Sequence, residues 1–529
     1  MGAEALVAGH AVQKSLGKDS TEEVLQYAAN ELIFAVVGHA GAGTSTVAEA
    51  LRELLNQDGY DVQIIKARAV IGAWAEQKKI QLPSDAVSLS NVEKWQDLGD
   101  GMREQTKDCS SVGRGMVAEV RRARANKLGQ DPAMDGPVRP DGHRRAYVLD
   151  SIRHPAEVEI LRHVYQDAFI LVGVVCEEER RLSRLTTKYA DAGRENAKKF
   201  MKRDAKAGPP HGQRVADAFH MADFFIDNSV ERLDNGSPNK NWDINDKLSR
   251  LIKMLRQEAI IRPESSETAM HHAAAAAMRS ACLSRQVGAS LIDSEGNIAA
   301  TGTNEVPRAG GGVYGEGFDE DREDNRCAFR SLPHGVSHYC SSNLEQIALV
   351  DKLILEIPEL NKLDAIRKLS LRQEIRKSGI GDLLEFSRAI HAEMDALLSA
   401  GRSGKNTIGG RLFVTTFPCH YCARHIVSSG VDVVQYIEPY PKSRAFSLHG
   451  DAVTQEAVNW LPPSKGGTKV LFRPFVGVAP RLYRRVFVKN RDLKDENGKM
   501  SVGTPIWGSS LHLRAASYVD LEAALAKMV

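Results

Sequence analysis

The order of hydrophobic and polar positions predicts an α/β fold for the first half of the chain. Continuous apolar runs are typical of strands that are buried on both faces of a parallel sheet. Four such runs occur, and after the first of them the apolar positions recur at helical spacing. Strands that alternate with helices predict a parallel sheet with helices on both faces. The four runs are Glu31–Val37, Tyr147–Asp150, Phe169–Val175 and Ala222–Asn228.

The second half predicts a separate α/β domain that carries helical and loop insertions. An alanine-rich helix at Ala269–Ser280 precedes two predicted strands, Gln286–Ile292 and Ile298–Gly302. Further along, Ser387–Leu398 predicts a short helix and Phe413–Thr416 a strand. The other predicted elements are a glycine-rich, acidic loop at Ala309–Asn325, a helical insertion at Leu344–Phe386, strands at Val470–Phe472 and Tyr483–Val488, and a closing helix at Tyr518–Met528.

Length and local composition divide the chain into domains. The chain has 529 residues, which is too long for a single hydrophobic core. We expect a poorly ordered N-terminus at residues 1–24 and a first domain at residues 25–256. A linker at residues 257–267, which contains Pro263, then leads to a second domain with a C-terminal extension at residues 268–529.

Composition and charge argue against several classes of protein. Hydrophobic residues make up 42% of the chain and charged residues 26%, which is ordinary for a globular protein. The net charge of +2 gives no basic field of the kind that favours binding to polynucleotides. No apolar run is long enough to cross a membrane, and 7 cysteines are too few for a disulfide scaffold. We therefore expect a cytoplasmic protein that makes no contact with a membrane.

A glycine-rich loop joins the first predicted strand to the first predicted helix. Gly38 and Gly43 have the spacing of a P-loop, in which backbone N–H groups bind phosphates. Ser45 stands where a P-loop has its Mg²⁺-binding hydroxyl, but Thr44 replaces the phosphate-binding lysine. A glycine-rich turn without any ligand is the alternative. The predicted phosphate-binding residues are Gly38, Gly41, Gly43, Thr44, Ser45 and Thr46, together with Asp150 at the end of a later strand.

Residues Leu32–Leu255 resemble the P-loop nucleotide kinases. Asp150 matches the acidic end of their second nucleotide-binding strand, and Glu179–Leu185 resembles their arginine-bearing lid helix. The resemblance implies a P-loop kinase-like domain that binds a nucleotide with Mg²⁺. Because the lysine that neutralises charge during phosphoryl transfer is absent, we expect binding without rapid hydrolysis. The alternative is a working kinase in which Arg180, Arg181 or Arg184 supplies the missing cation.

Two motifs in the second domain supply candidate metal ligands. His391-Ala392-Glu393 is followed downstream by Pro418-Cys419-His420-Tyr421-Cys422. A catalytic zinc takes three protein ligands and keeps its fourth position open for water, which suits His391, Cys419 and Cys422. Glu393 is then placed to transfer protons rather than to bind the metal. This order of residues resembles the signature of zinc-dependent nucleobase deaminases, and a purely structural zinc site is the alternative.

Five separated motifs resemble those of the deoxycytidylate deaminase family and occur in the family's order. The resemblance covers about residues 268–445 and implies a cytidine-deaminase-like α/β domain. Within the family, the chain resembles bacterial proteins that join a P-loop domain to such a deaminase. Those proteins act in antiphage defence by depleting deoxycytidine nucleotides. The motifs are Met278–Ser280, Gln286–Ala289, Gly302–Pro307, His391–Glu393 and Phe417–Cys419.

The family resemblance also implies a reaction, substrate-binding residues and an assembly. Free dCTP or dCMP would be deaminated to the deoxyuridine nucleotide and ammonia. Asn304 would hydrogen-bond the sugar, while Arg279 and Ser280 would lie near the phosphate. After the zinc cysteines the chain departs from the family pattern, and Tyr440, Lys442 and Arg444 there would suit a triphosphate. The resemblance further implies a homo-oligomer built from dimers, with a hexamer as the expected form.

A second set of metal-ligand residue types lies in the insertion after Pro307. Cys327, His334, His338 and Cys340 would suit a second, structural zinc. Their spacing is irregular, so an unrelated group of cysteines and histidines is an equal alternative.

The sequence is compatible with several functions. The first is a zinc deaminase of free deoxycytidine nucleotides, regulated by the P-loop domain in response to an unidentified inhibitor or phage product. The second is a deaminase of tRNA or single-stranded DNA, which would need a basic, aromatic-lined channel, whereas only 6% of the residues are aromatic. A bifunctional deaminase and nucleotide kinase is a further alternative. A non-catalytic nucleotide-binding regulator is disfavoured because Glu393 is intact.

Overall fold

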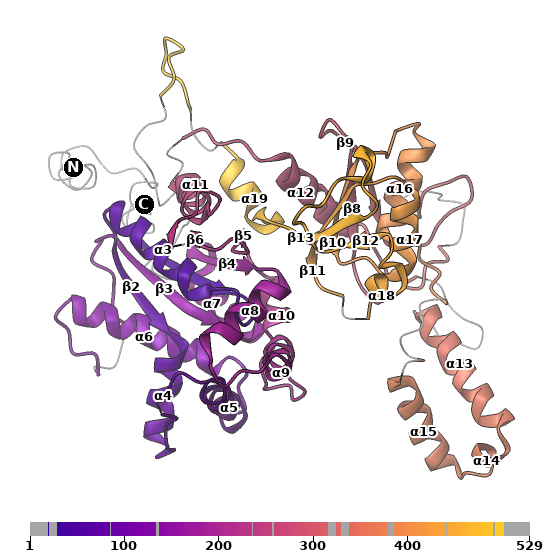
Figure 1. Ribbon diagram of the computed structural model, residues 1–529, viewed down its shortest axis with the longest axis horizontal. Coiled ribbons are helices and arrows are strands. Elements are labelled where there is room, and N and C mark those ends of the chain that lie inside the picture. Colours follow the sequence, from indigo (N-terminus) through magenta and orange to yellow (C-terminus); the bar gives the residue numbers. More distant parts are fainter. Residues whose placement is uncertain are drawn as a thin grey trace. The chain divides into compact units, whose positions relative to one another are not determined.

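The computed structural model divides the chain into two compact units (Figure 1). The first unit combines the residues up to Pro263 with those from Val476 onward, and the second is Glu264–Phe475. The predicted closing helix Tyr518–Met528 and nearly all of residues 1–24 lie outside the described residues. The described residues are 20, 29–84, 86–133, 137–234, 236–256, 259–315, 324–329, 338–378, 380, 386–440, 442–489 and 492–501.

A six-stranded sheet with the order β14-β5-β4-β1-β3-β2 forms the centre of the first unit. The central strand β1 (Glu31–Val37) pairs in parallel with β3 (Arg145–Ile152) and β4 (Phe169–Val175). All residues of these three strands are buried, which confirms the prediction made from their continuous apolar runs. The outer strands are β2 (Asp61–Lys66) and β5 (Phe224–Asp227), which are parallel, and β14 (Gly477–Val478), which is antiparallel.

Helices pack on both faces of this sheet, as the alternation of strands and helices predicts. On one face, Phe34 and Val36 of β1 share a core with α3 (Thr44–Gln57) and α11 (Ile244–Arg256). The alternate residues of β1 are equally buried, and α7 (Pro155–Tyr165) contacts β3 and β4. The other elements are α4 (Ala67–Gln77), α5 (Leu89–Thr106), α6 (Ser111–Lys127), η1 (Gln166–Ala168), α8 (Glu178–Lys188), α9 (Arg194–Ala205), α10 (Val215–Phe219) and the short hairpin β6 (Leu233–Asp234) and β7 (Ser237–Pro238).

The end of the described chain returns to the first unit, which differs from the sequence-based assignment. Residues 268–529 were all expected in the second domain, whereas β14 pairs with β5 and α19 (Pro480–Phe487) packs into the core of the first unit. The prediction of a strand at Tyr483–Val488 is wrong. Leu482 and Val486, four residues apart, bury one face of a helix, and Pro480 suits its first turn.

The second unit has its own six-stranded sheet, with the order β12-β13-β11-β10-β8-β9. β8 (Gly288–Ile292) and β9 (Ile298–Thr303) form the predicted hairpin, and β8 continues antiparallel onto β10 (Arg411–Thr416). From β10 the sheet continues in parallel through β11 (Val433–Glu438), β13 (Val470–Pro474) and β12 (Val453–Thr454). The helices of this layered α/β unit are α12 (Ser265–Ala277), α16 (Ala392–Arg402), α17 (His420–Ser428) and α18 (Ala445–His449), with η4 (Pro463–Lys465) between β12 and β13.

The predicted helical insertion is present between β9 and α16. Its helices are α13 (Ser341–Glu356), α14 (Pro358–Asn361) and α15 (Ala365–Lys377), of which α13 packs against the other two (Figure 1). Few of their side chains are buried, and α15 has none. The insertion therefore adds a small helical arm to the second unit without extending its hydrophobic core.

Two glycines allow helices to pack so closely on this sheet that the helix backbone contacts the strand backbone. A Cβ atom on Gly288 of β8 would lie 1.9 Å from the backbone oxygen of Ala273 in α12. A Cβ atom on Gly302 of β9 would lie 2.1 Å from the backbone oxygen of Ala392 in α16. Only glycine leaves room for these contacts, so the position of α16 on the sheet depends on Gly302.

Candidate active site

His391 and Glu393 lie at the N-terminal end of α16. The sequence predicted a helix from Ser387, but α16 begins at Ala392. The preceding segment stays extended because Ile390 forms a β-bridge with Glu305 and donates its N–H to the Glu305 backbone oxygen at 3.0 Å. His391 is therefore the cap residue of the helix, and Glu393 lies in the first turn.

Cys419 and Cys422 lie at the N-terminal end of α17, directly after β10. Cys419 is the cap residue of this helix, and its sulfur accepts a hydrogen bond from the backbone N–H of Cys422 at 3.5 Å. Donors at a helix N-terminus and the positive end of its dipole favour the thiolate form of cysteine. The strand and the helix thus present both sulfurs on one side, as the sequence predicted.

The three predicted metal ligands converge. The Nδ1 atom of His391 lies 3.3 Å from the sulfur of Cys419 and 3.4 Å from the sulfur of Cys422. A tetrahedral zinc with ordinary bond lengths would place such nitrogen and sulfur atoms roughly 3.5 Å apart. Within the described part of the chain, this triad is the only group of three or more His, Cys, Asp or Glu residues whose ligand atoms lie within 4.8 Å of one another. The geometry and the donor types therefore fit zinc.

The three side chains of the triad shift one another's pKa values. A hydrogen bond from Cys422 and the neighbouring His391 lower the pKa of the Cys419 thiol to about 4. The hydrogen bond with Cys419 in turn raises the pKa of His391 to about 9. Hydrogen bonding to Cys419 and burial raise the pKa of the Cys422 thiol. The lowered pKa of Cys419 favours its thiolate form, which is the form that zinc requires.

Glu393 is a buried carboxyl group beside the triad. Glu393 is only 4% exposed, and this burial raises the pKa of its carboxyl above the ordinary value. The Cys422 thiol forms a hydrogen bond with it. A carboxyl group whose pKa is raised toward neutrality can both accept and donate a proton, so it suits general acid–base work.

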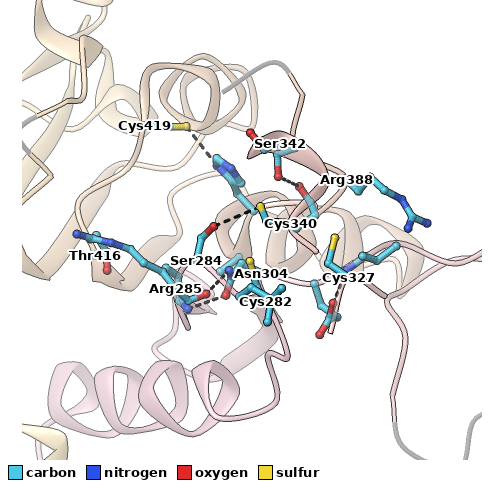
Figure 2. A pocket seen from close by; sticks show the side chains of 18 of the residues that line it. Cys282, Ser284, Arg285, Asn304, Cys327, Cys340, Ser342, Arg388, Thr416 and Cys419 are labelled. Atoms are coloured by element: carbon cyan, nitrogen blue, oxygen red, sulfur yellow. Dashed lines mark hydrogen bonds between the residues drawn. The ribbon is translucent and has the colours of Figure 1, made fainter. Parts of the chain in front are cut away.

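A cavity of about 200 Å³ lies beside His391 and Cys419 of the triad (Figure 2). Its wall includes Glu393 and His391 at one side and residues of the loops that flank β8 and β9 at the other. Both ends of the helical arm reach this wall, because Cys340–Ser342 lead into α13 and Ser387–Ala389 follow α15. The site is therefore assembled from the sheet, from two helix ends and from the insertion.

Residues 263–438 match the model of the cytidine and deoxycytidylate deaminase zinc-binding region. This part of the chain is therefore similar to that family. Deoxycytidylate deaminase of Enterobacteria phage T4 is 29% identical over 186 residues, which are 34% of this chain and 80% of the phage protein. ComE operon protein 2 of Bacillus subtilis (strain 168) is 41% identical over 54 residues, which are 10% of this chain and only 29% of that protein.

Among solved structures, the dCMP deaminase of cyanophage S-TIM5 in complex with dCMP and dUMP is similar to this chain. It has 20% sequence identity and a TM-score of 0.22, and the match covers 41% of this chain and 99% of that chain.

Of the substrate-binding residues predicted in this deaminase region, Asn304 and Tyr440 line the cavity. The Asn304 side chain accepts a hydrogen bond from the Val287 N–H at 2.6 Å and donates one to the Arg285 backbone oxygen at 2.6 Å. Ser280 is buried beneath the wall, where its hydroxyl donates to the Asn304 backbone oxygen at 2.7 Å. Ser280, Arg279, Lys442 and Arg444 are not among the described residues that line the cavity.

Several cavity residues of the deaminase region were missed by sequence reasoning. Ser284 and Arg285 precede β8, Thr416 ends β10, and Arg388 precedes the zinc-binding histidine (Figure 2). None of them belongs to a spaced motif. The one available signal was proximity in sequence, since Arg285 lies two residues before Val287 of the family motif Gln286–Ala289.

The predicted ligands of a second zinc are only partly described. Cys327 and Cys340 line the cavity, and the sulfur of Cys327 lies 3.0 Å from the hydroxyl of Ser341. His338 forms a hydrogen bond with the backbone oxygen of Ala328 at 2.8 Å, and His334 lies outside the described residues. The described members of the set do not form a metal-binding group, so the second zinc stays a prediction.

The glycine loop of the first unit has the local structure that the sequence predicted. It connects β1 to α3, which begins at Thr44, and Gly41 and Gly43 adopt positive φ angles of 83° and 84°. The hydroxyl of Ser45 donates to a carboxylate oxygen of Asp150 at 2.8 Å. Ser45, where the sequence predicts a Mg²⁺-binding hydroxyl, therefore lies beside Asp150 at the N-terminus of a helix.

Proposed function

We propose that this protein is a zinc-dependent deaminase of free deoxycytidine nucleotides, which converts dCMP or dCTP to the deoxyuridine nucleotide and ammonia. The observation that carries this proposal is the convergence of His391, Cys419 and Cys422 beside a cavity whose wall includes Glu393. The match of residues 263–438 to the deaminase family model supports it, as does the similarity to a phage deoxycytidylate deaminase.

The proposed chemistry is a hydrolytic substitution at C4 of cytosine. Zinc held by the triad would lower the pKa of a water molecule and make hydroxide available near neutral pH. The carboxylate of Glu393 would accept a proton from the attacking water and deliver it to the ring nitrogen beside C4. The same carboxyl would then accept the proton of the hydroxyl added at C4 and pass it to the amino group, so that the C4–O bond becomes a carbonyl, the C4–N bond breaks and ammonia leaves. The burial of Glu393 suits this role because it keeps the pKa of the carboxyl raised between transfers.

The direct test is ammonia release by the zinc-loaded full chain from dCMP, dCTP, deoxycytidine and a cytosine-containing oligonucleotide. We expect turnover of at least one free nucleotide and none of the oligonucleotide. Turnover of the oligonucleotide alone would favour the polynucleotide deaminase instead. Zinc bound in the expected amount with no ammonia from any of the four compounds would reject a cytosine deaminase.

We further propose that the first unit binds a nucleotide with Mg²⁺ and regulates the deaminase, and that the protein depletes deoxycytidine nucleotides in antiphage defence. The hydrogen bond between Ser45 and Asp150 supports a Mg²⁺ site at the glycine loop. We also propose a homo-oligomer built from dimers, with a hexamer as the expected form. Light scattering that finds a monomer would reject this assembly. None of the described helices is long and apolar enough to span a membrane.

A further inference from the structure

Arg285 is one of two arginines among the described residues that line the cavity. The other, Arg388, donates a hydrogen bond to the backbone oxygen of Asn325, and its side chain points away from Cys419 and Asn304 (Figure 2). The side chain of Arg285 instead extends toward Thr416, at the end of β10 (Figure 2). Arg285 is thus the cation whose position suits a ligand that reaches the triad.

Several contacts hold Arg285 against the cavity wall. Its backbone oxygen accepts a hydrogen bond from Asn304, and its Nη1 atom lies 3.0 Å from Oε1 of Glu438. The other carboxylate oxygen of Glu438 accepts a hydrogen bond from the Thr416 hydroxyl at 3.1 Å. The guanidinium carbon lies 5.7 Å from the ring centre of Tyr440. Because Asn304, Thr416 and Tyr440 all line the cavity, these contacts orient Arg285 within the site.

The ion pair with Glu438 leaves Arg285 able to bind an anion. The Arg285 side chain is 47% exposed, and Nη1 makes its shortest contact with Glu438. A guanidinium carries five N–H donors in one plane, so the donors on Nε and Nη2 can pair with a second partner. Half-exposed ion pairs are weak, whereas two parallel hydrogen bonds from arginine to phosphate are strong. A phosphate can therefore bind without first breaking the contact with Glu438.

We propose that Arg285 binds the phosphate next to the sugar of the substrate nucleotide, with Glu438 and Tyr440 as positioning residues. This inference rests on the proposed deaminase function and deepens it. It replaces the sequence-based expectation that Arg279 lies near this phosphate, since Arg279 is exposed and is not among the described lining residues.

The test compares dCMP with deoxycytidine, which differs from it only by the missing phosphate. Arg285→Gln should lower kcat/KM for dCMP about 10- to 100-fold, mainly through KM, because it removes hydrogen bonds to a charged group. The same variant should leave kcat/KM for deoxycytidine within about twofold, because that substrate has no group for Arg285 to bind. Arg285→Lys should restore part of the loss for dCMP, since lysine supplies the charge but not the planar pair of donors. Arg367→Gln in α15 is the matched control, because its side chain is 50% exposed and is not among the described lining residues, and it should leave both substrates unchanged.

Two outcomes would overturn the proposal. An equal loss on both substrates would mean that Arg285 only shapes the wall, and an unchanged KM for dCMP would remove its phosphate role. Calorimetry of dCMP binding to Glu393→Ala, with and without Arg285→Gln, does not depend on turnover. One result is that the wild type releases no ammonia while Arg285→Gln still abolishes dCMP binding to the Glu393→Ala protein. In that case the phosphate role of Arg285 stands and the proposed deaminase function fails. If Arg285→Gln leaves that binding unchanged, the phosphate role fails whatever the turnover.

Discussion

At the residue scale, Glu393 is the group on which proton transfer depends in the proposed reaction. Its carboxyl is buried beside the three predicted zinc ligands but is not one of them. We predict that Glu393→Ala lowers kcat by at least about 10²–10⁴-fold, because a single general acid–base group commonly contributes that much. Zinc should remain bound, since no ligand has changed. Ammonia release and metal content by emission spectrometry measure the two effects separately.

Two further variants control this experiment. Glu295→Ala removes an exposed carboxylate from the turn between β8 and β9 and should change neither activity nor zinc content. Cys419→Ala should lose both, because it removes a ligand and the thiolate. Full turnover by Glu393→Ala would contradict the assignment of the proton carrier.

The number of substrate phosphates is a second question at this scale. Lys442 and Arg444 are exposed and follow Tyr440, which lines the cavity. If the first phosphate pairs with Arg285, the further phosphates of dCTP can extend toward these cations. We predict that Lys442→Gln combined with Arg444→Gln raises KM for dCTP more than KM for dCMP. Equal changes for the two nucleotides in steady-state kinetics would argue against a phosphate role for this pair.

The candidate site could be predicted from the sequence only where chemistry restricts both residue type and spacing. Zinc coordination fixes His391, Cys419 and Cys422 in this way, and the structure brings their ligand atoms together. Arg285 has no such signature. Its position depends on Glu438 and Asn304, which come from distant segments of the chain, and the sequence does not show that pairing.

At the element scale, strands buried on both faces were the most predictable. The apolar runs at β1 and β4 match the observed bounds, because neither strand has a polar face. The edge strand β2 was missed since most of its residues are partly exposed, which interrupts the apolar run. The start of α16 was placed too early because the β-bridge of Ile390 with Glu305 is a tertiary contact that overrides local helix preference.

The contact between β9 and α16 gives a prediction at this scale. A side chain on Gly302 would clash with the backbone of α16, which carries Glu393 and follows His391. We predict that Gly302→Val lowers the free energy of unfolding by about 1–3 kcal/mol or more, as overpacking does, and reduces zinc content. Denaturant unfolding and metal analysis of the purified protein measure both quantities.

The matched control for this change lies in the same helix. Gly401 in α16 has no atom within 4 Å of a Cβ placed on it. Gly401→Ala should therefore leave zinc content unchanged and raise stability by up to about 1 kcal/mol, because alanine favours helix. A Gly302→Val protein as stable and as rich in zinc as the wild type would show that α16 can shift without cost.

At the scale of the whole molecule, the second unit is inserted into the first. Glu264–Phe475 lies between two segments of the first unit, and only residues 475–476 separate β13 in one sheet from β14 in the other. A chain shortened to begin near Pro263 would leave β14 and α19 without their sheet and expose Leu482 and Val486, which are now buried. Control of the deaminase by the first unit is therefore better tested with single substitutions in the full chain.

Gly43 offers such a substitution. It has a positive φ angle, and a Cβ atom on it would lie 2.3 Å from the side-chain nitrogen of Asn228, which donates to the Ala42 backbone oxygen. We predict that Gly43→Val weakens binding of Mg²⁺-ATP to the full chain by at least about tenfold, because it distorts the backbone donors that would cradle the phosphates. Zinc content should stay unchanged. Gly59→Val is the matched control, since Gly59 has a similar φ angle of 79° but no atom within 4 Å of its Cβ position.

The same pair of variants tests regulation through thermodynamic linkage. If nucleotide bound at the glycine loop changes the affinity of the deaminase for dCMP by some factor, dCMP must change the affinity for that nucleotide by the same factor. Glu393→Ala allows both titrations by calorimetry, because dCMP is then not consumed. We expect equal factors in the two directions, retained with Gly59→Val and lost with Gly43→Val. Independent binding at the two sites would show that the first unit does not control the deaminase. Transfer of phosphate from ATP to a deoxynucleotide would show instead that the protein is a bifunctional enzyme.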